Sequence, residues 1–89
     1  MYQLFKNETT NTQSGAVKTY RARHTVFAWG TWGSATAKLQ ISPDGATWFD
    51  LTGASFTANG TATFEVATDC WLRADISGGT AANLNVAVR

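Results

Sequence analysis

The chain carries few residues that could perform acid–base or nucleophilic chemistry. It has one histidine, His24, and one cysteine, Cys70. A Ser-His-Asp triad around His24 is formally possible, but no nucleophile elbow or oxyanion-hole motif accompanies it. A single cysteine excludes an intramolecular disulfide and a cysteine-based zinc site. We therefore predict no catalytic residue.

The carboxylates do not form a pattern that would serve catalysis or metal binding. A glycosidase needs two of them about 5 to 10 Å apart in a cleft, and a chain of 89 residues has little room for one. Asp44 stands alone where a calcium loop needs several close oxygen ligands. The glycines match neither the phosphate-binding loop nor the dinucleotide fingerprint. The expectation is a protein that is not an enzyme and that uses no metal or cofactor.

Tryptophan and arginine offer a different chemistry, which is that of contact surfaces. Along the run from Cys70 to Arg73, alternation turns Trp71 and Arg73 outward. Large aromatics and arginine are enriched in the cores of protein interfaces. The pattern favours a contact with a partner or another subunit. The alternative is a lone surface tryptophan that a neighbouring segment partly covers.

Two more indoles, Trp29 and Trp32, flank a glycine-containing corner. They could stack on a sugar or anchor a protein partner, or they could cover the open end of a β-sandwich. We favour the covering role for Trp29, because it continues the face of Thr25 and Phe27. Both roles stay open for Trp32.

Short β-strands must position these side chains. Apolar and polar residues alternate in short runs that turn residues interrupt about every ten positions. Apolar residues do not recur at helical spacing over three turns, so we expect essentially no helix. The pattern predicts an all-β fold, an antiparallel β-sandwich of seven or eight short strands, either immunoglobulin-like or jelly-roll-like. The expected strands cover residues 16–20, 24–29, 35–42, 47–51, 56–58, 61–66, 70–76 and 84–88, of which the first two could be one bent strand.

Three turn signals separate the later strands. Ser42-Pro43-Asp44-Gly45 is a turn in which proline sets φ, aspartate caps locally and glycine takes positive φ. Asn59-Gly60 is the strongest short hairpin signal, and it predicts that residues 56–58 and 61–66 pair directly. Gly78-Gly79 makes the last turn.

The first fifteen residues differ from the rest. Apart from Tyr2, Leu4 and Phe5 they are polar up to Gly15, and residues 7–14 cannot bury a core of their own. We predict an N-terminal arm or loop over residues 1–15, whose first residues dock on this subunit or on a neighbour. Residues 16–89 are expected to form a single β-sandwich domain.

Charge argues against two classes of partner. Seven Lys and Arg stand against six Asp and Glu, for a net charge of +1. Binding to nucleic acid or to a membrane surface needs a clustered excess of one sign, so neither partner is expected. No apolar run is long enough for a membrane span or a signal peptide, which predicts synthesis in the cytoplasm.

A run of motifs begins at about Thr25. It consists of Phe27-Ala28-Trp29-Gly30-Thr31-Trp32-Gly33, then Ala37-Lys38-Leu39-Gln40-Ile41-Ser42-Pro43-Asp44-Gly45-Ala46-Thr47-Trp48, then Thr57-Ala58-Asn59-Gly60, Phe64-Glu65-Val66 and Leu72-Arg73-Ala74-Asp75-Ile76-Ser77-Gly78. Over about two-thirds of the chain, these motifs resemble a family of small accessory β-sandwich proteins of tailed bacteriophages. The N-terminal third lies outside the resemblance.

The resemblance implies a structural protein of the virion, without an active site. A head decoration (cement) protein is the first expectation, and a head–tail adaptor or tail accessory protein is a variant. The implied partners are the major capsid protein or another virion protein, together with further copies of the chain in a homo-oligomer, a trimer first. We expect the contacts to involve Tyr2, Leu4, Phe5, Trp32, Trp71 and Arg73.

A third alternative comes from the indoles rather than from the resemblance. A carbohydrate-binding module for attachment to a host surface would use Trp29, Trp32 and Trp71 as stacking surfaces. It predicts at least two coplanar, exposed indoles in a lone monomer.

Overall fold

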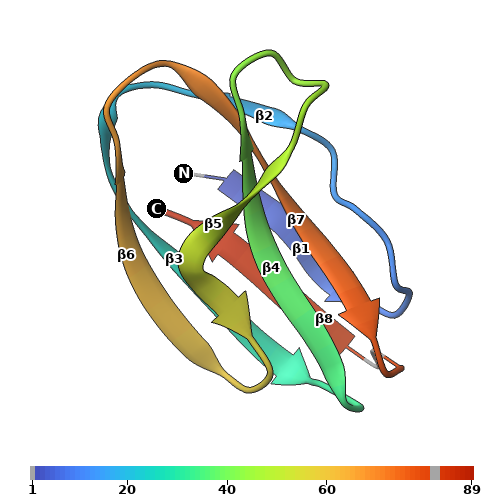
Figure 1. The fold of residues 1–89 in the computed structure, drawn as a ribbon. Coiled ribbons are helices and arrows are strands. Elements are labelled where there is room, and N and C mark those ends of the chain that lie inside the picture. The colour runs from blue at the N-terminus through green and yellow to red at the C-terminus, as the bar shows by residue number, and fades with distance from the viewer. Residues whose placement is uncertain (1, 81–82) are drawn as a thin grey trace.

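Eight β-strands form two four-stranded antiparallel sheets that pack face to face in the computed structural model, which describes residues 2–80 and 83–89 (Figure 1). The all-β sandwich expected from the sequence is confirmed, and the described residues contain no helix, hence none that could cross a membrane. Sheet A has the order β1-β8-β3-β6, and sheet B has the order β2-β7-β4-β5. The strands are β1 (Tyr2–Glu8), β2 (Val17–Thr19), β3 (Ala22–Thr31), β4 (Ala35–Ser42), β5 (Phe49–Phe56), β6 (Gly60–Val66), β7 (Cys70–Gly78) and β8 (Asn83–Val88).

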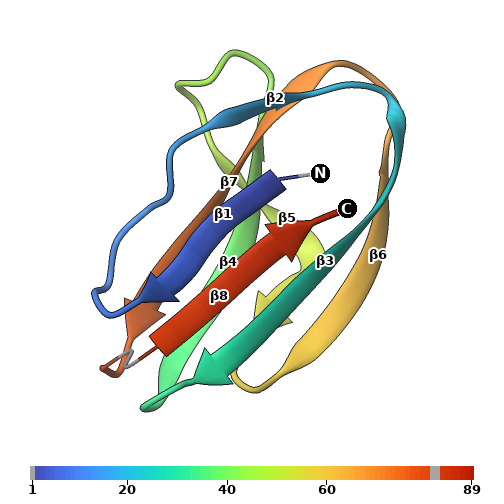
Figure 2. The same ribbon diagram turned by 180° about the vertical axis from the view of Figure 1, so that it is seen from behind.

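The strand pairing follows a simple rule. β1 pairs with β8, β2 with β7, β3 with β6, and β4 with β5. A chain folded into one long hairpin and then rolled up produces these pairs, and the result is the jelly-roll connectivity of two four-stranded sheets. An immunoglobulin-like sandwich, the other possibility that the sequence allowed, would pair consecutive strands in several hairpins. Here only β4 and β5 are both consecutive and paired (Figures 1 and 2).

The predicted hairpin at Asn59-Gly60 is therefore wrong. β5 lies in sheet B and β6 in sheet A, so the segment between them crosses from one sheet to the other. Asn59 serves a tertiary contact instead. Its Oδ1 accepts hydrogen bonds from the Gly30 N–H (3.0 Å) and the Trp32 Nε1–H (2.9 Å). The segment over residues 16–29 also changes sheets, which resolves it into two strands, β2 and β3.

The N-terminal segment docks on its own subunit, one of the two possibilities that the sequence left open, but its first residues form a strand and not a free arm. Residues 2–8 form the edge strand β1, which pairs with β8 from Tyr2↔Val88 to Glu8↔Leu84. The polar run that follows is also attached, because Ser14 N–H donates to the Ala74 carbonyl and Ile76 N–H to the Thr12 carbonyl. At the predicted last turn, β7 ends at Gly78, which has a φ of 72°. Residues 1 and 81–82 lie outside the described part of the chain.

The core lies between the two sheets. Alternation predicted its members well in β4 and β7, where Leu39, Leu72 and Ile76 are fully buried. Burial of such side chains stabilises each by roughly 1.5–3 kcal/mol relative to exposure. The cluster comprises Phe5, Val26, Ala28, Ala35, Ala37, Leu39, Ala54, Leu72, Ala74, Ile76, Leu84, Val86 and Val88.

The Ser42-Pro43-Asp44-Gly45 turn has the expected chemistry. Asp44 Oδ1 accepts hydrogen bonds from the N–H groups of Thr47 and Ala46, both at 2.8 Å, and from the Ser42 hydroxyl at 3.1 Å. These bonds, that of Thr47 first, lower the pKa of Asp44 below its ordinary value of 3.8. Gly45 has a φ of 79°, in the left-handed region that the sequence predicted.

The turn yields a pH-dependent prediction. Because its folded-state pKa is lowered, ionised Asp44 stabilises the fold above its unfolded pKa, and this stabilisation is lost as pH falls through the folded pKa. Asp44→Asn keeps an acceptor oxygen but removes the charge. We expect the variant to have a lower urea midpoint than the wild type near neutrality, and the gap to close between about pH 5 and about pH 2. If the urea midpoints of the two proteins differed equally at both ends of that range, ionised Asp44 would not be the source of the stabilisation.

Candidate binding surface

The first candidates for chemistry are His24, Cys70 and the carboxylates. Within residues 2–80 and 83–89, no three His, Cys, Asp or Glu side chains come together as a metal site would need. His24 is half-buried, with its Nε2 3.1 Å from the Thr19 hydroxyl and its ring beside Phe64. Cys70 is buried, and burial raises the pKa of its thiol, which makes it a poor nucleophile.

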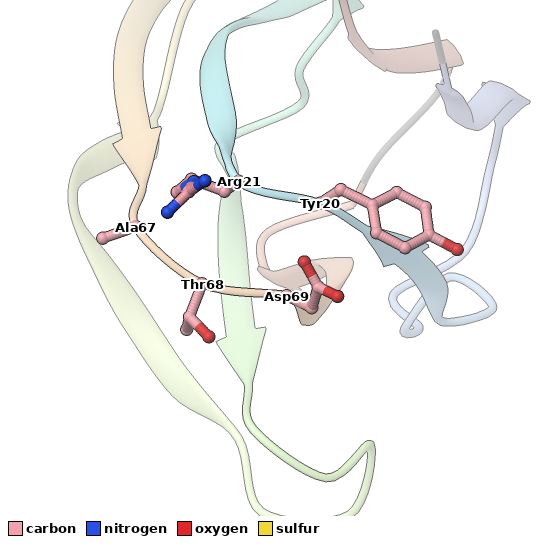
Figure 3. Close-up of a pocket in the computed structure, with 5 residues that line it drawn as sticks. All are labelled: Tyr20, Arg21, Ala67, Thr68 and Asp69. Carbon is pink, nitrogen blue, oxygen red and sulfur yellow. The ribbon is translucent and has the colours of Figure 1, made fainter.

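An open hollow lies at the end of the sandwich where the segments β2–β3 and β6–β7 meet. Tyr20, Arg21, Ala67, Thr68 and Asp69 line it. The side chains of Tyr20 and Arg21 point in opposite directions, so they do not converge on a common point (Figure 3).

The predicted contact residues of the first strand are occupied within their own chain. Phe5 is 5% exposed and belongs to the core, while Leu4 is half-buried against it. The Tyr2 hydroxyl donates to the Lys18 carbonyl at 2.9 Å and so ties sheet A to sheet B. Phe5 is therefore unavailable to a partner, contrary to the sequence-based assignment.

Trp32 is likewise held by intramolecular contacts. Its ring is half-buried against the core, and its Nε1–H donates to Asn59 Oδ1. The sequence left open whether Trp32 contacts a partner or covers the end of the sandwich. The structure favours the covering role.

Trp71 and Arg73 lie on the outer face of sheet B, as alternation predicted, since their neighbours in β7 are buried. Lys18 Nζ lies 5.1 Å from the Trp71 ring centroid, and Arg73 Cζ lies 4.4 Å from that of Trp48. A Cβ placed on Gly45 would lie 3.6 Å from the Trp71 ring, so the turn also covers this indole. A neighbouring segment covering Trp71 was the alternative allowed by the sequence.

The polar side chains on the same face bind one another. Arg73 Nε–H donates to Gln40 Oε1 at 2.7 Å, and Gln40 Nε2–H donates to Asp50 Oδ1 at 2.9 Å. Lys38 Nζ completes the row at 3.5 Å from Asp50 Oδ2. The Gln40 hydrogen bond, and then the Lys38 charge, lower the pKa of Asp50. These contacts hold the polar side chains of this face against one another.

The outer face of sheet A has a different character. In β3, Val26 and Ala28 point into the core, so Phe27 and Trp29 point outward. The expectation that Trp29 covers the open end of the sandwich is wrong, because the residue lies on a sheet face and is 42% exposed. We call this surface the aromatic face. Its uncharged centre is formed by Gln3, Thr25, Phe27, Trp29, Thr61 and Thr63. Asn85 and Ala87 point to the same side but are buried.

The aromatic face is hollowed and firmly held. A shallow depression lies on it, lined by Phe27, Trp29, Gly60 and neighbouring residues of β3 and β6. Asn85 connects three strands, since its Oδ1 accepts from the Asn7 N–H (3.0 Å) and its Nδ2 donates to the Trp29 carbonyl (3.4 Å). Rigid support of this kind reduces the ordering that a partner must impose on binding.

The tryptophans do not form a shared platform. All four lie in the described part of the chain, and Trp29 alone is largely exposed. Trp71 lies on the opposite sheet from Trp29, so the two cannot flank one sugar. The arrangement of coplanar exposed indoles that a carbohydrate-binding module requires is not formed by the three indoles that the sequence nominated.

The geometry defines an all-β jelly-roll sandwich in which the outer face of one sheet has an uncharged, aromatic centre. Comparisons of the chain with protein-family models, with curated proteins and with solved structures found no match.

Proposed function

We propose that the protein is a non-enzymatic virion structural protein of a tailed bacteriophage, a head decoration (cement) protein that binds the capsid through its aromatic face. The assignment to a phage virion depends on the sequence resemblance. The single observation that supports the mode of action is the uncharged centre of the outer face of sheet A, with Trp29 exposed beside Phe27.

Interface cores are depleted of charge and enriched in aromatic residues, and the aromatic face has this composition. The charges on this side of sheet A lie around its centre, at Lys6, Arg23, Glu65 and Arg89. A polar rim around an apolar centre is the usual anatomy of a protein–protein interface. Jelly rolls occur in viral capsid proteins and also in lectins, so the fold alone is compatible with either class and decides between neither.

The proposed mechanism is mechanical. A rigid sandwich that contacts two neighbouring capsid subunits carries part of the load that would otherwise fall on the contacts between them. The proposal needs no cofactor, and lattice symmetry would repeat a modest contact many times. A head–tail adaptor would use the same face against a different virion protein.

Trp29→Ala tests the proposal. Truncating an aromatic anchor at the centre of an interface costs about 2 kcal/mol or more, so we expect roughly 30-fold weaker binding to purified phage heads, measured by co-sedimentation. The control is Phe49→Ala, which removes another exposed aromatic, 57% exposed, from β5 in the other sheet. It should bind like the wild type.

Two outcomes would contradict the decoration role, and a third would contradict the assigned contact surface. Binding to tails or connectors without binding to heads would favour an adaptor. Saturable binding to an oligosaccharide that Trp29→Ala abolishes, without head binding, would favour the carbohydrate-binding alternative. Equal loss in the Trp29 and Phe49 variants would show that the aromatic face is not the contact surface.

A further inference from the structure

The edges of the two sheets differ in how well they are protected. An edge strand presents unpaired N–H and C=O groups, and proteins guard it with bulges, charges or short length. β1 has two register shifts against β8 and a positive φ at Asn7. β2 has only three residues. β5 is broken by a register shift against β4, has a positive φ at Gly53 and carries Asp50 in an ion pair.

β6 is the least protected of the four edge strands. Its seven residues pair with β3 in an unbroken register from Ala22↔Val66 to Ala28↔Gly60. It contains no proline, and Glu65 is its single charge. Among residues 2–80 and 83–89, no hydrogen bond joins a backbone group of β6 to an element on its far side. Both ribbon views show β6 as the outermost strand, with nothing beyond it (Figures 1 and 2).

We propose that β6 pairs antiparallel with β6 of a second copy, so that sheet A continues across a two-fold axis into an eight-stranded sheet. The sequence of the strand fits this occupant. Full-length antiparallel pairing of Gly60–Val66 with itself places Thr63 on the axis, so Glu65 faces Thr61 of the second copy. In-register parallel pairing would oppose Glu65 to Glu65, and like charges directly opposite one another are destabilising.

The inner side of the strand fits the same register. Ala62 of one copy faces Phe64 of the other, so the large ring packs against the small side chain. Phe64 is half-buried at the edge of the core, and this contact would cover it further. Because the pairing is isologous, it closes with two copies, in place of the trimer first expected from the sequence.

The dimer does not depend on the proposed function, since it concerns the purified protein alone. It has one consequence for that function. A two-fold axis perpendicular to the sheet places both aromatic faces on the same side, which would let one dimer engage two sites and gain avidity.

Two substitutions of opposite charge at Thr61 test the proposed dimer. Thr61 is exposed on the outer face and faces Glu65 of the second copy, twice per dimer. Thr61→Lys should tighten the dimer and Thr61→Glu should weaken it, with dissociation constants that differ roughly 20-fold by sedimentation equilibrium. The same two substitutions at Thr52, an exposed residue of β5 at an edge of sheet B, are the matched control, and their dissociation constants should differ little.

Net charge alone predicts the opposite order, because Thr61→Lys raises the charge of a chain that is already at +1. Circular dichroism of each variant checks that the monomer is folded. Amide hydrogen exchange should slow with protein concentration in β6 and not in β5. A protein that stays monomeric at roughly millimolar concentration, a trimer, or weakening by both Thr61 variants would overturn the proposal.

Discussion

Phe5→Ala is expected to lower the free energy of unfolding by about 3–5 kcal/mol. Phe5 is 5% exposed and packs in the core from the edge strand β1, so truncation leaves a cavity between the sheets. The total free energy of unfolding of a domain of this size is roughly 5–15 kcal/mol. The loss is therefore a large fraction of the stability, and it should be measured by urea unfolding followed by tryptophan fluorescence.

The neighbouring substitution Lys6→Ala is the control. Lys6 is exposed in the same strand, so its truncation should change stability by no more than about 0.5 kcal/mol. The pair of variants distinguishes an integral strand from a free arm. If Phe5→Ala were as stable as Lys6→Ala, the first residues would not contribute to the core, and the prediction of an arm would be restored.

Gly30→Ala is expected to destabilise the protein by about 3–5 kcal/mol. Gly30 has a φ of 138°, which side chains rarely adopt, and it lies in β3 opposite Leu84. A Cβ at this position would lie 1.8 Å from the Asn83 carbonyl oxygen and 2.9 Å from its carbon. These are backbone atoms of the adjacent strand, so relief requires moving β8 or breaking the Gly30–Asn59 hydrogen bond.

Gly15→Ala is the matched control for backbone effects. No atom lies within 4 Å of a Cβ placed there, and the residue does not need a positive φ. Because alanine restricts the unfolded chain more than glycine does, this variant should be neutral or gain up to about 1 kcal/mol. Similar midpoints for the two variants in chemical denaturation would show that β8 accommodates the methyl group, contrary to the geometry.

Local chemistry explains which predictions from sequence succeeded. The turn at residues 42–45 depends on proline, aspartate and glycine preferences that act within four residues, and the turn forms as expected. β4 and β7 have one apolar and one polar face, so alternation alone identified their inner residues. β3 is apolar on both faces between Val26 and Trp29, so alternation could not tell which side was inward, and the exposed Trp29 was assigned to a covering role.

The sequence by itself therefore determined the all-β class, the sandwich, most strand positions and the inner faces of the strands with one polar side. Tertiary structure decided the rest. The jelly-roll connectivity and the sheet change at Asn59-Gly60 depend on which strands lie side by side, and no local preference encodes this. Pairing with β8, eighty residues away in the chain, made a strand of the polar N-terminal segment. The same long-range pairing decided that the face shared by Phe27 and Trp29 is an outer face, because a sheet has an inner and an outer side only after distant segments have met.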